Sequence, residues 1–166
     1  MKSLFVKLTL LLAVVVALST KIVLADQNVD KIISLLSSYD SEVSTTKLEE
    51  LAGGKQQLID LLLALRLKEK PPFVATRSEK ILIGYSDEPR VAQILEQDMQ
   101  DPNLRGLAQI ITLHLDTIPS ATLRKSLASR ATTRARVEKE FTPYASDLKN
   151  SKDQEVRRIA TESAAN

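Results

Sequence analysis

The sequence contains no cysteine, no tryptophan, one histidine and four glycines in 166 residues. Without cysteine the chain forms no disulfide and has no thiol to bind a metal ion or carry a lipid. A single imidazole is too few for a histidine-based metal site, so we expect no metal and no cofactor. Aromatic residues make up 4% of the chain. None of them lies among the basic residues between Arg124 and Lys139, so a stacking platform for single-stranded nucleic acid is unsupported.

The segment 1–25 predicts a cleaved secretory signal peptide. Lys2 and Lys7 accompany an almost wholly apolar run at 8–18, and Val23–Ala25 offers small residues where a signal peptidase reads. The alternative, an uncleaved membrane anchor, needs about 20 continuous apolar residues. Three polar residues interrupt the run too early for that. We expect cleavage after Ala25, a periplasmic or secreted protein, and no stable membrane insertion after cleavage.

Removal of this leader changes the charge balance. The leader holds three of the 23 Lys and Arg and none of the 21 Asp and Glu, which leaves 20 against 21, a net charge of −1. Attraction of the whole molecule to nucleic acid is therefore not indicated. The segment 26–166 has the length of a single domain, which needs no metal or disulfide to fold.

Apolar residues recur at helical spacing along most of the chain. A helix is expected from Asn28, and another where Thr46 and Glu49 make a capping-box spacing. Positions 58–67 are apolar on nearly every side, which indicates a core helix. Pro71–Pro72 would end that helix and open the next. Strand-like alternation is scarce, so the sequence predicts an all-α fold.

An eight-residue phrase occurs twice, as DPNLRGLA at 101–108 and as DQEVRRIA at 153–160. In each copy the aspartate is suited to cap a helix, and the alanine is small enough for another helix to approach. We expect this motif to be structural, with an arginine one turn from each aspartate. Its residues are Asp101, Arg105, Ala108, Asp153, Arg157 and Ala160.

This pattern, D-x-x-[LV]-R-x-[LI]-A opening a second helix, resembles that of HEAT-type helical repeats, best over 89–118 and 141–165. A weaker copy lies at 74–85, 30 positions before 104–115. The resemblance implies antiparallel helix pairs stacked in a short right-handed α-solenoid, with Asp and Arg linking adjacent repeats. It implies no reaction. The alternative is an irregular helical bundle in which two caps happen to look alike.

Two isolated polar residues are candidates for chemistry. His114 and Asp116 point about 200° apart on a helix, so they cannot chelate a metal together, and a structural role is favoured for His114. Asp60 lies within an apolar helix. We expect it to face solvent or pair with an arginine of a neighbouring helix rather than act as a catalytic acid. A spatial pair of carboxylates, as in glycosidases, stays open.

Between Arg124 and Lys139 there are six basic residues against Glu138 alone. The sequence shows no local acidic complement to this run, which suggests a surface that binds an anionic partner. A solvated helix face is the alternative. The candidate binding residues are Arg124, Arg130, Arg134 and Arg136.

The sequence therefore favours a non-catalytic exported helical-repeat protein, a scaffold or adaptor that binds another protein or an anionic component of the cell envelope. No nucleic acid partner is expected, and no oligomeric state is indicated. Two alternatives stay open. One is a carboxylate-dependent hydrolase or lyase acting on the envelope, and the other is a periplasmic chaperone-like or membrane-surface binding protein.

Overall fold

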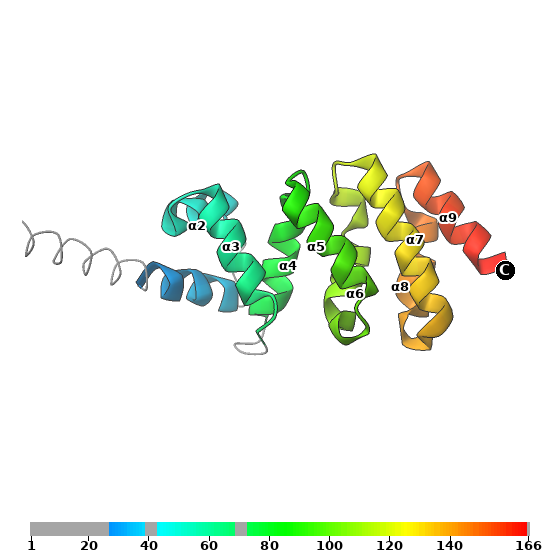
Figure 1. The fold of residues 1–166 in the computed structure, drawn as a ribbon, viewed down its shortest axis with the longest axis horizontal. Coiled ribbons are helices and arrows are strands. Elements are labelled where there is room, and N and C mark those ends of the chain that lie inside the picture. Colours follow the sequence, from blue (N-terminus) through cyan, green and yellow to red (C-terminus); the bar gives the residue numbers. More distant parts are fainter. Residues whose placement is uncertain (1–26, 39–42, 69–72, 166) are drawn as a thin grey trace, which may run out of the picture. The chain divides into compact units, whose positions relative to one another are not determined.

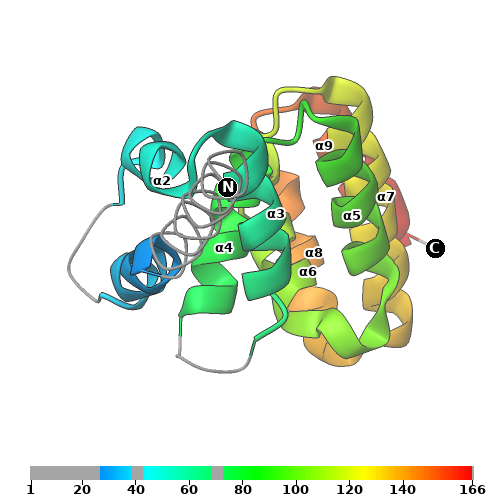
Figure 2. The same cartoon turned by 60° about the vertical axis from the view of Figure 1, so that its left-hand side comes forward.

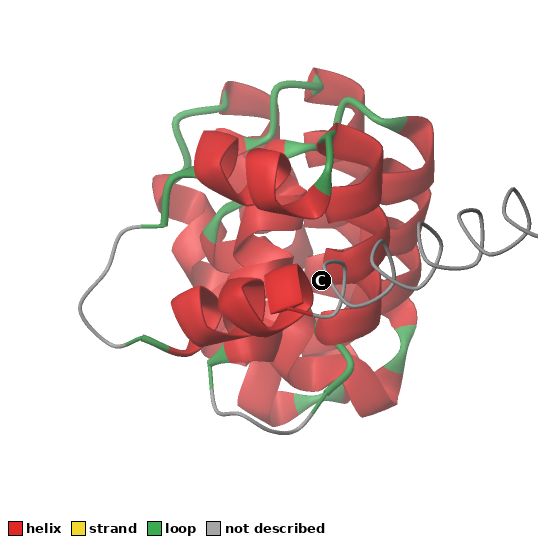
Figure 3. Ribbon diagram, turned by 90° about the vertical axis from the view of Figure 1, so that its left-hand side faces the viewer, coloured by secondary structure: helices red, strands yellow, loops and turns green. Residues whose placement is uncertain are grey.

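The computed structural model describes residues 27–38, 43–68 and 73–165. These residues are helices and connecting turns with no strand among them, which confirms the all-α prediction (Figure 3). The predicted signal peptide and the predicted break at Pro71–Pro72 lie outside the described ranges. The chain divides into two compact units, residues 1–58 and 59–166.

The first unit contains a helix at 27–37 and helix α2 (Thr45–Ala52). The N-cap of α2 is Ser44, whose hydroxyl accepts a hydrogen bond from the Lys47 amide at 3.5 Å, so the cap predicted at Thr46 is wrong by two positions. The helix ends at Gly53, where φ is 89°. This left-handed conformation carries no steric cost for glycine. Helix α3 (Lys55–Leu65) then crosses the boundary between the two units.

The helices of the second unit form two rows (Figures 1 and 2). In the outer row, α5 contacts α7 and α7 contacts α9; in the inner row, α4 contacts α6 and α6 contacts α8. Contacts of α5 with α6 and of α7 with α8 join the rows. This arrangement is consistent with a solenoid or a bundle. The helices are α4 (Val74–Gly84), α5 (Pro89–Gln100), α6 (Arg105–Leu113), α7 (Ala121–Val137), α8 (Thr142–Asp147) and α9 (Gln154–Ala165).

Helix α7 shows why these sequences pack in rows. Its buried residues Leu123, Leu127 and Ala131 recur every four positions and therefore share one face. Ala128 and Ala131 are fully buried, and small side chains there let neighbouring helices approach closely. The helix contacts both α5 and α9. A buried alanine also occurs at both copies of the repeated phrase, at Ala108 and Ala160.

The two copies of the phrase nevertheless occupy different places in the fold. The first copy leads through the short 3-10 helix η1 (Pro102–Leu104) into α6 of the inner row, whereas the second leads into α9 of the outer row. Asp101 accepts a hydrogen bond from the Asn103 amide at 2.8 Å, and Asp153 accepts one from the Glu155 amide at 2.9 Å. Both aspartates act as caps, but the expectation that both open equivalent second helices is wrong.

A closer structural recurrence relates α7 to α9. Arg124 Nη1 donates to the carbonyl oxygens of Ile118 and Pro119, at 2.5 and 3.0 Å. Arg157, 33 positions later, makes the same pair of contacts with Ser151 and Lys152, at 2.6 and 3.0 Å. In each case an arginine in the first turn of a helix fastens the loop that precedes it.

Candidate functional site

The basic run on α7 is mostly engaged within the molecule. Arg134 is buried and donates to the carbonyl oxygens of Met99 at 3.1 Å and Pro102 at 3.3 Å. Its Nε lies 3.0 Å from a Glu138 oxygen, an ion pair without hydrogen-bond alignment, and its guanidinium lies 5.2 Å from the centre of the Phe141 ring. Arg134 therefore holds the connection between α5 and α6 against α7.

Two other arginines of the run have acidic partners. Arg124 forms an ion pair with Asp153 at 2.9 Å, and Arg130 forms one with Glu96 at 3.6 Å. The run has no acidic complement nearby in sequence, but it has one in space, because Glu96 lies on α5 and Asp153 lies directly before α9. These contacts favour a structural role for Arg124 and Arg130, and binding of a partner by them stays a prediction. Arg136 is exposed.

The isolated polar residues have structural surroundings. Asp60 pairs with Arg90 at 2.5 Å, which confirms the predicted pairing with an arginine of a neighbouring helix. His114 is half-buried at the C-cap of α6, where burial, together with the positive charge of Lys80, lowers its pKa. Within the described ranges, no group of three or more His, Cys, Asp or Glu side chains is placed to hold a metal ion.

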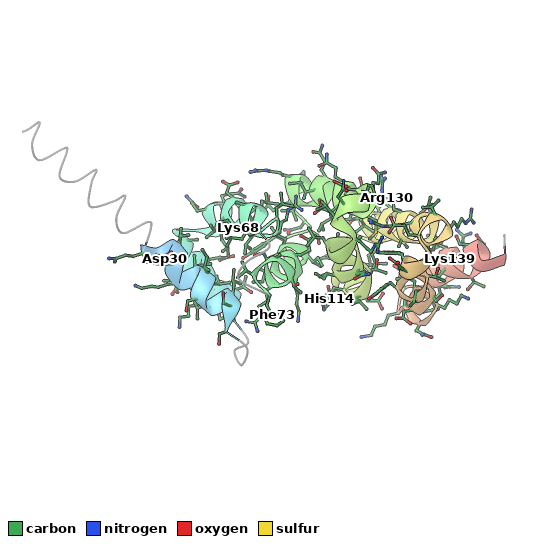
Figure 4. The ribbon with its side chains drawn as sticks, turned by 90° about the horizontal axis from the view of Figure 1, so that it is seen from below. Asp30, Lys68, Phe73, His114, Arg130 and Lys139 are labelled. Atoms are coloured by element: carbon green, nitrogen blue, oxygen red, sulfur yellow. The ribbon has the colours of Figure 1, made fainter. Side chains whose placement is uncertain are left out.

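An open groove of about 610 Å³ lies along the inner row of the second unit. Leu67 and Leu113 line it and are 57% and 58% exposed, although both are large apolar side chains. Among the described residues of the lining, the charged ones are the cations Arg66 and Lys68, and none is acidic. Figure 4 marks Lys68 beyond the end of α3 and His114 at the end of α6. The remaining lining residues are Ala75, Thr76, Asn103, Leu104, Gly106, Leu107, Gln109, Ile110 and Tyr144.

A cluster of charged side chains lies behind one wall of this groove. Arg66 lines the groove and donates from Nη1 to the carboxylate of Asp98, and both side chains are buried. Glu79 of α4 is 0% exposed, and neither of its carboxyl oxygens has a hydrogen-bond partner in the described structure. Burial, with the negative charge of Asp98, raises the pKa of Glu79 to about 8 despite the opposing charge of Arg66. At neutral pH, Glu79 is therefore mainly protonated.

Burial also raises the pKa of Asp98, against the opposing effect of Arg66. Because Glu79 and Asp98 are buried, their carboxyl groups cannot contact a ligand in the groove. Sequence reasoning missed this cluster, since Glu79 looks like an ordinary charged residue in a helix. The available signal was its position on the same helical face as Leu82 and Ile83, both of which are buried.

Comparisons of the chain with protein-family models, curated proteins and solved structures give no match. None of the helices in the described ranges combines the length and the apolar character needed to cross a membrane.

Proposed function

We propose that this protein is a non-catalytic helical-repeat binding protein, a scaffold or adaptor, which holds a segment of another protein in the groove of the inner row. The observation that carries the proposal is the exposure of Leu67 and Leu113 in one concave surface. Covering such apolar surface contributes about 25 cal/mol per Å² to binding. Exposed apolar side chains gathered in a groove are typical of interaction sites.

The charge of the groove specifies the kind of segment. Lys68 is exposed at the groove, and no carboxylate of the described chain lines it. A partner segment that presents apolar side chains together with Asp or Glu would therefore match both its shape and its charge. The proposed occupant is an acidic amphipathic segment of an envelope protein, given the export expected from the segment 1–25. Stacked HEAT-like helix pairs, supported by the two rows and the recurrence between α7 and α9, would supply the surface.

Binding is favoured over catalysis by the chemistry of the lining. The polar lining side chains include Thr76, Asn103 and Gln109, which supply hydrogen bonds but no general base. The described part of the groove contains no pair of carboxylates and no nucleophile beside an imidazole. These groups suit recognition of a peptide and its backbone.

The chain offers a direct test because it has no cysteine of its own. Gly106 lines the groove, and a Cβ added there has open space around it apart from its chain neighbours and the backbone of its own helix. A Gly106→Cys variant labelled with an environment-sensitive fluorophore would report occupancy. A synthetic amphipathic peptide of leucine and glutamate should change the fluorescence saturably. The same peptide with lysine in place of glutamate should bind much more weakly.

Variants then locate the binding surface. Leu67→Ser and Leu113→Ser should each lower the affinity for the acidic peptide about tenfold. Each substitution removes apolar contact worth roughly 1.4 kcal/mol of binding free energy. The matched control is Val137→Ser, which changes an apolar side chain that is 80% exposed on α7 and outside the groove lining. The proposed function would be overturned if Val137→Ser lost as much affinity as the groove variants. It would also be overturned if the two peptides bound equally well, or if neither bound saturably.

A further inference from the structure

A second, smaller pocket of about 140 Å³ lies among α7, α8 and α9. Two cations line it, Arg136 of α7 and Lys149 of the 3-10 helix η4 (Leu148–Asn150), and no described carboxylate does. Hydroxyl groups of Ser146 and Ser163 also line it. Its volume is several times the roughly 30 Å³ that a water molecule occupies in the liquid, so it has room for a polyatomic ion.

Both cations are available to a ligand. Within the described ranges, neither Arg136 nor Lys149 makes an ion pair or a hydrogen bond through its side chain, and both are exposed. This separates Arg136 from Arg124, Arg130 and Arg134, whose guanidinium groups already have partners. Of the four arginines that the sequence singled out, Arg136 alone keeps its donors free in the described structure.

The hydroxyl groups of the pocket lining also differ in whether they already donate a hydrogen bond within the protein. Thr132 Oγ1 donates to the Ser129 carbonyl at 2.9 Å, and Thr142 Oγ1 donates to the Ala135 carbonyl at 3.4 Å, so these two lining residues have used their protons. The Ser146 hydroxyl makes no such contact in the described structure and keeps its proton for a ligand. An arginine, a lysine and a free serine hydroxyl together supply enough donors for the oxygens of a tetrahedral anion.

The acidic residues that lie near this lining in sequence do not themselves line the pocket. Asp147, next to Ser146 and two positions before Lys149, lines a different pocket together with Asp116 and Tyr144. Glu138, two positions after Arg136, is paired with Arg105 and Arg134. Glu162, next to Ser163, is paired with Arg158. The described lining of the pocket therefore carries two cations and no carboxylate.

We propose that the Arg136–Lys149 pocket binds a phosphate group. The planar guanidinium of Arg136 can contact two phosphate oxygens at once, Lys149 adds a second positive charge, and Ser146 donates a further hydrogen bond. The phosphate is either the free ion or the terminal group of a phosphomonoester lipid, because both present the same oxygens. This site is separate from the groove of the inner row and stands independently of the proposed function.

The test is a titration of the protein with inorganic phosphate at constant ionic strength, followed by calorimetry and by the backbone amide NMR signals of α7 and α8. We expect saturable binding of one phosphate, with shifts centred on Arg136 and Ser146. Arg136→Gln and Lys149→Gln should each weaken the affinity by about tenfold or more, the size expected for one charge-assisted hydrogen bond. Lys125→Gln removes an exposed cation on the same helix but outside the pocket, and should leave the affinity unchanged.

A second arm distinguishes the two sources of phosphate. Phosphatidylcholine vesicles with and without phosphatidic acid are sedimented with the protein and with the same variants. If the protein sediments with the vesicles only when phosphatidic acid, Arg136 and Lys149 are all present, the site binds a lipid headgroup. If the protein binds inorganic phosphate but does not sediment with the vesicles, the site binds the free ion. Absence of both, or equal losses in Lys125→Gln and the pocket variants, would overturn the proposal.

Discussion

Arg66 and Asp98 form a buried ion pair that joins the end of α3 to α5, and the same arginine lines the groove of the inner row. The charges of Arg66 and Asp98 both affect the pKa of Glu79. The Glu79 carboxyl group nevertheless makes no hydrogen bond to either side chain. Arg66 therefore belongs both to the lining of the groove and to the buried cluster. The stability of the second unit should consequently respond to pH.

The free energy of unfolding should fall as pH rises from about 5 to 8. The folded protein keeps the Glu79 proton until its pKa of about 8, whereas the unfolded chain releases it near the ordinary glutamate pKa of 4.5. The folded state therefore binds more protons over this interval, and stability decreases with pH. A shift of this size corresponds to at most about 5 kcal/mol at 1.36 kcal/mol per unit.

Urea unfolding at pH 5 and pH 8 measures this difference. Glu79→Gln keeps the shape of the protonated side chain but cannot ionise, so it should flatten the pH dependence and gain stability relative to wild type at pH 8. A Glu79→Gln variant whose stability falls between pH 5 and 8 as steeply as that of wild type would contradict the assignment.

Asp98→Ala should lower the free energy of unfolding by about 3 to 5 kcal/mol, because it leaves the buried Arg66 guanidinium unpaired. Asp60→Ala provides the control. It breaks an ion pair with Arg90 in which both side chains are more than half exposed, so it should cost less than about 1 kcal/mol. Similar losses in the two variants, measured by urea unfolding, would show that the Arg66–Asp98 pair is not buried as described.

Arg134→Ala should destabilise the protein by about 2 to 4 kcal/mol, since it leaves the Met99 and Pro102 carbonyls without this donor and removes one of the ion pairs of Glu138. Arg136→Ala should change stability by no more than about 0.5 kcal/mol, because its side chain is exposed and unbonded in the described structure. Thermal unfolding of the two variants side by side checks this contrast. Equal melting temperatures for the two variants would contradict the structural role of Arg134 and its contrast with Arg136.

Loss of the Asp101 cap in Asp101→Ala should cost about 0.5 to 2 kcal/mol. Asp153→Ala should cost more, because Asp153 accepts from the Glu155 and Val156 amides and also pairs with Arg124. The Arg124 hydrogen bond holds the pKa of Asp153 below its usual range, so its contribution should fade as the pH is lowered. Equal stabilities of the two variants at neutral pH would argue against the link between α7 and α9.

Some of this structure could be predicted from sequence and some could not. Helical spacing was enough for the all-α fold, and the pairing of Asp60 with an arginine followed from the cost of an unpaired carboxylate in an apolar helix. The partners of Arg124 and Arg130 were hidden because Asp153 and Glu96 lie 29 and 34 positions away and meet the arginines only after the helices pack.

The repeated phrase misled for a related reason. Its two copies share the local chemistry of a helix start, which every helix of either row requires, so local similarity could not tell α6 from α9. Glu79 was missed because its burial depends on what surrounds α4, not on its neighbours in sequence. In each case a tertiary contact decided the role of a residue whose local pattern was ordinary.

The matching loops fastened by Arg124 and Arg157 also bear on how such a chain can change over generations. The segment from one of these arginines to the next contains one helix start and one arginine that donates to the preceding loop. Duplicating or deleting one such segment would therefore preserve these arginine–carbonyl contacts. A gain or loss of the longer segment between the two phrases, from Asp101 to Asp153, would instead place an inner helix where an outer one belongs. Homologous chains of different lengths should therefore differ by whole multiples of the spacing between Arg124 and Arg157, and each added segment would lengthen the surface available to a partner.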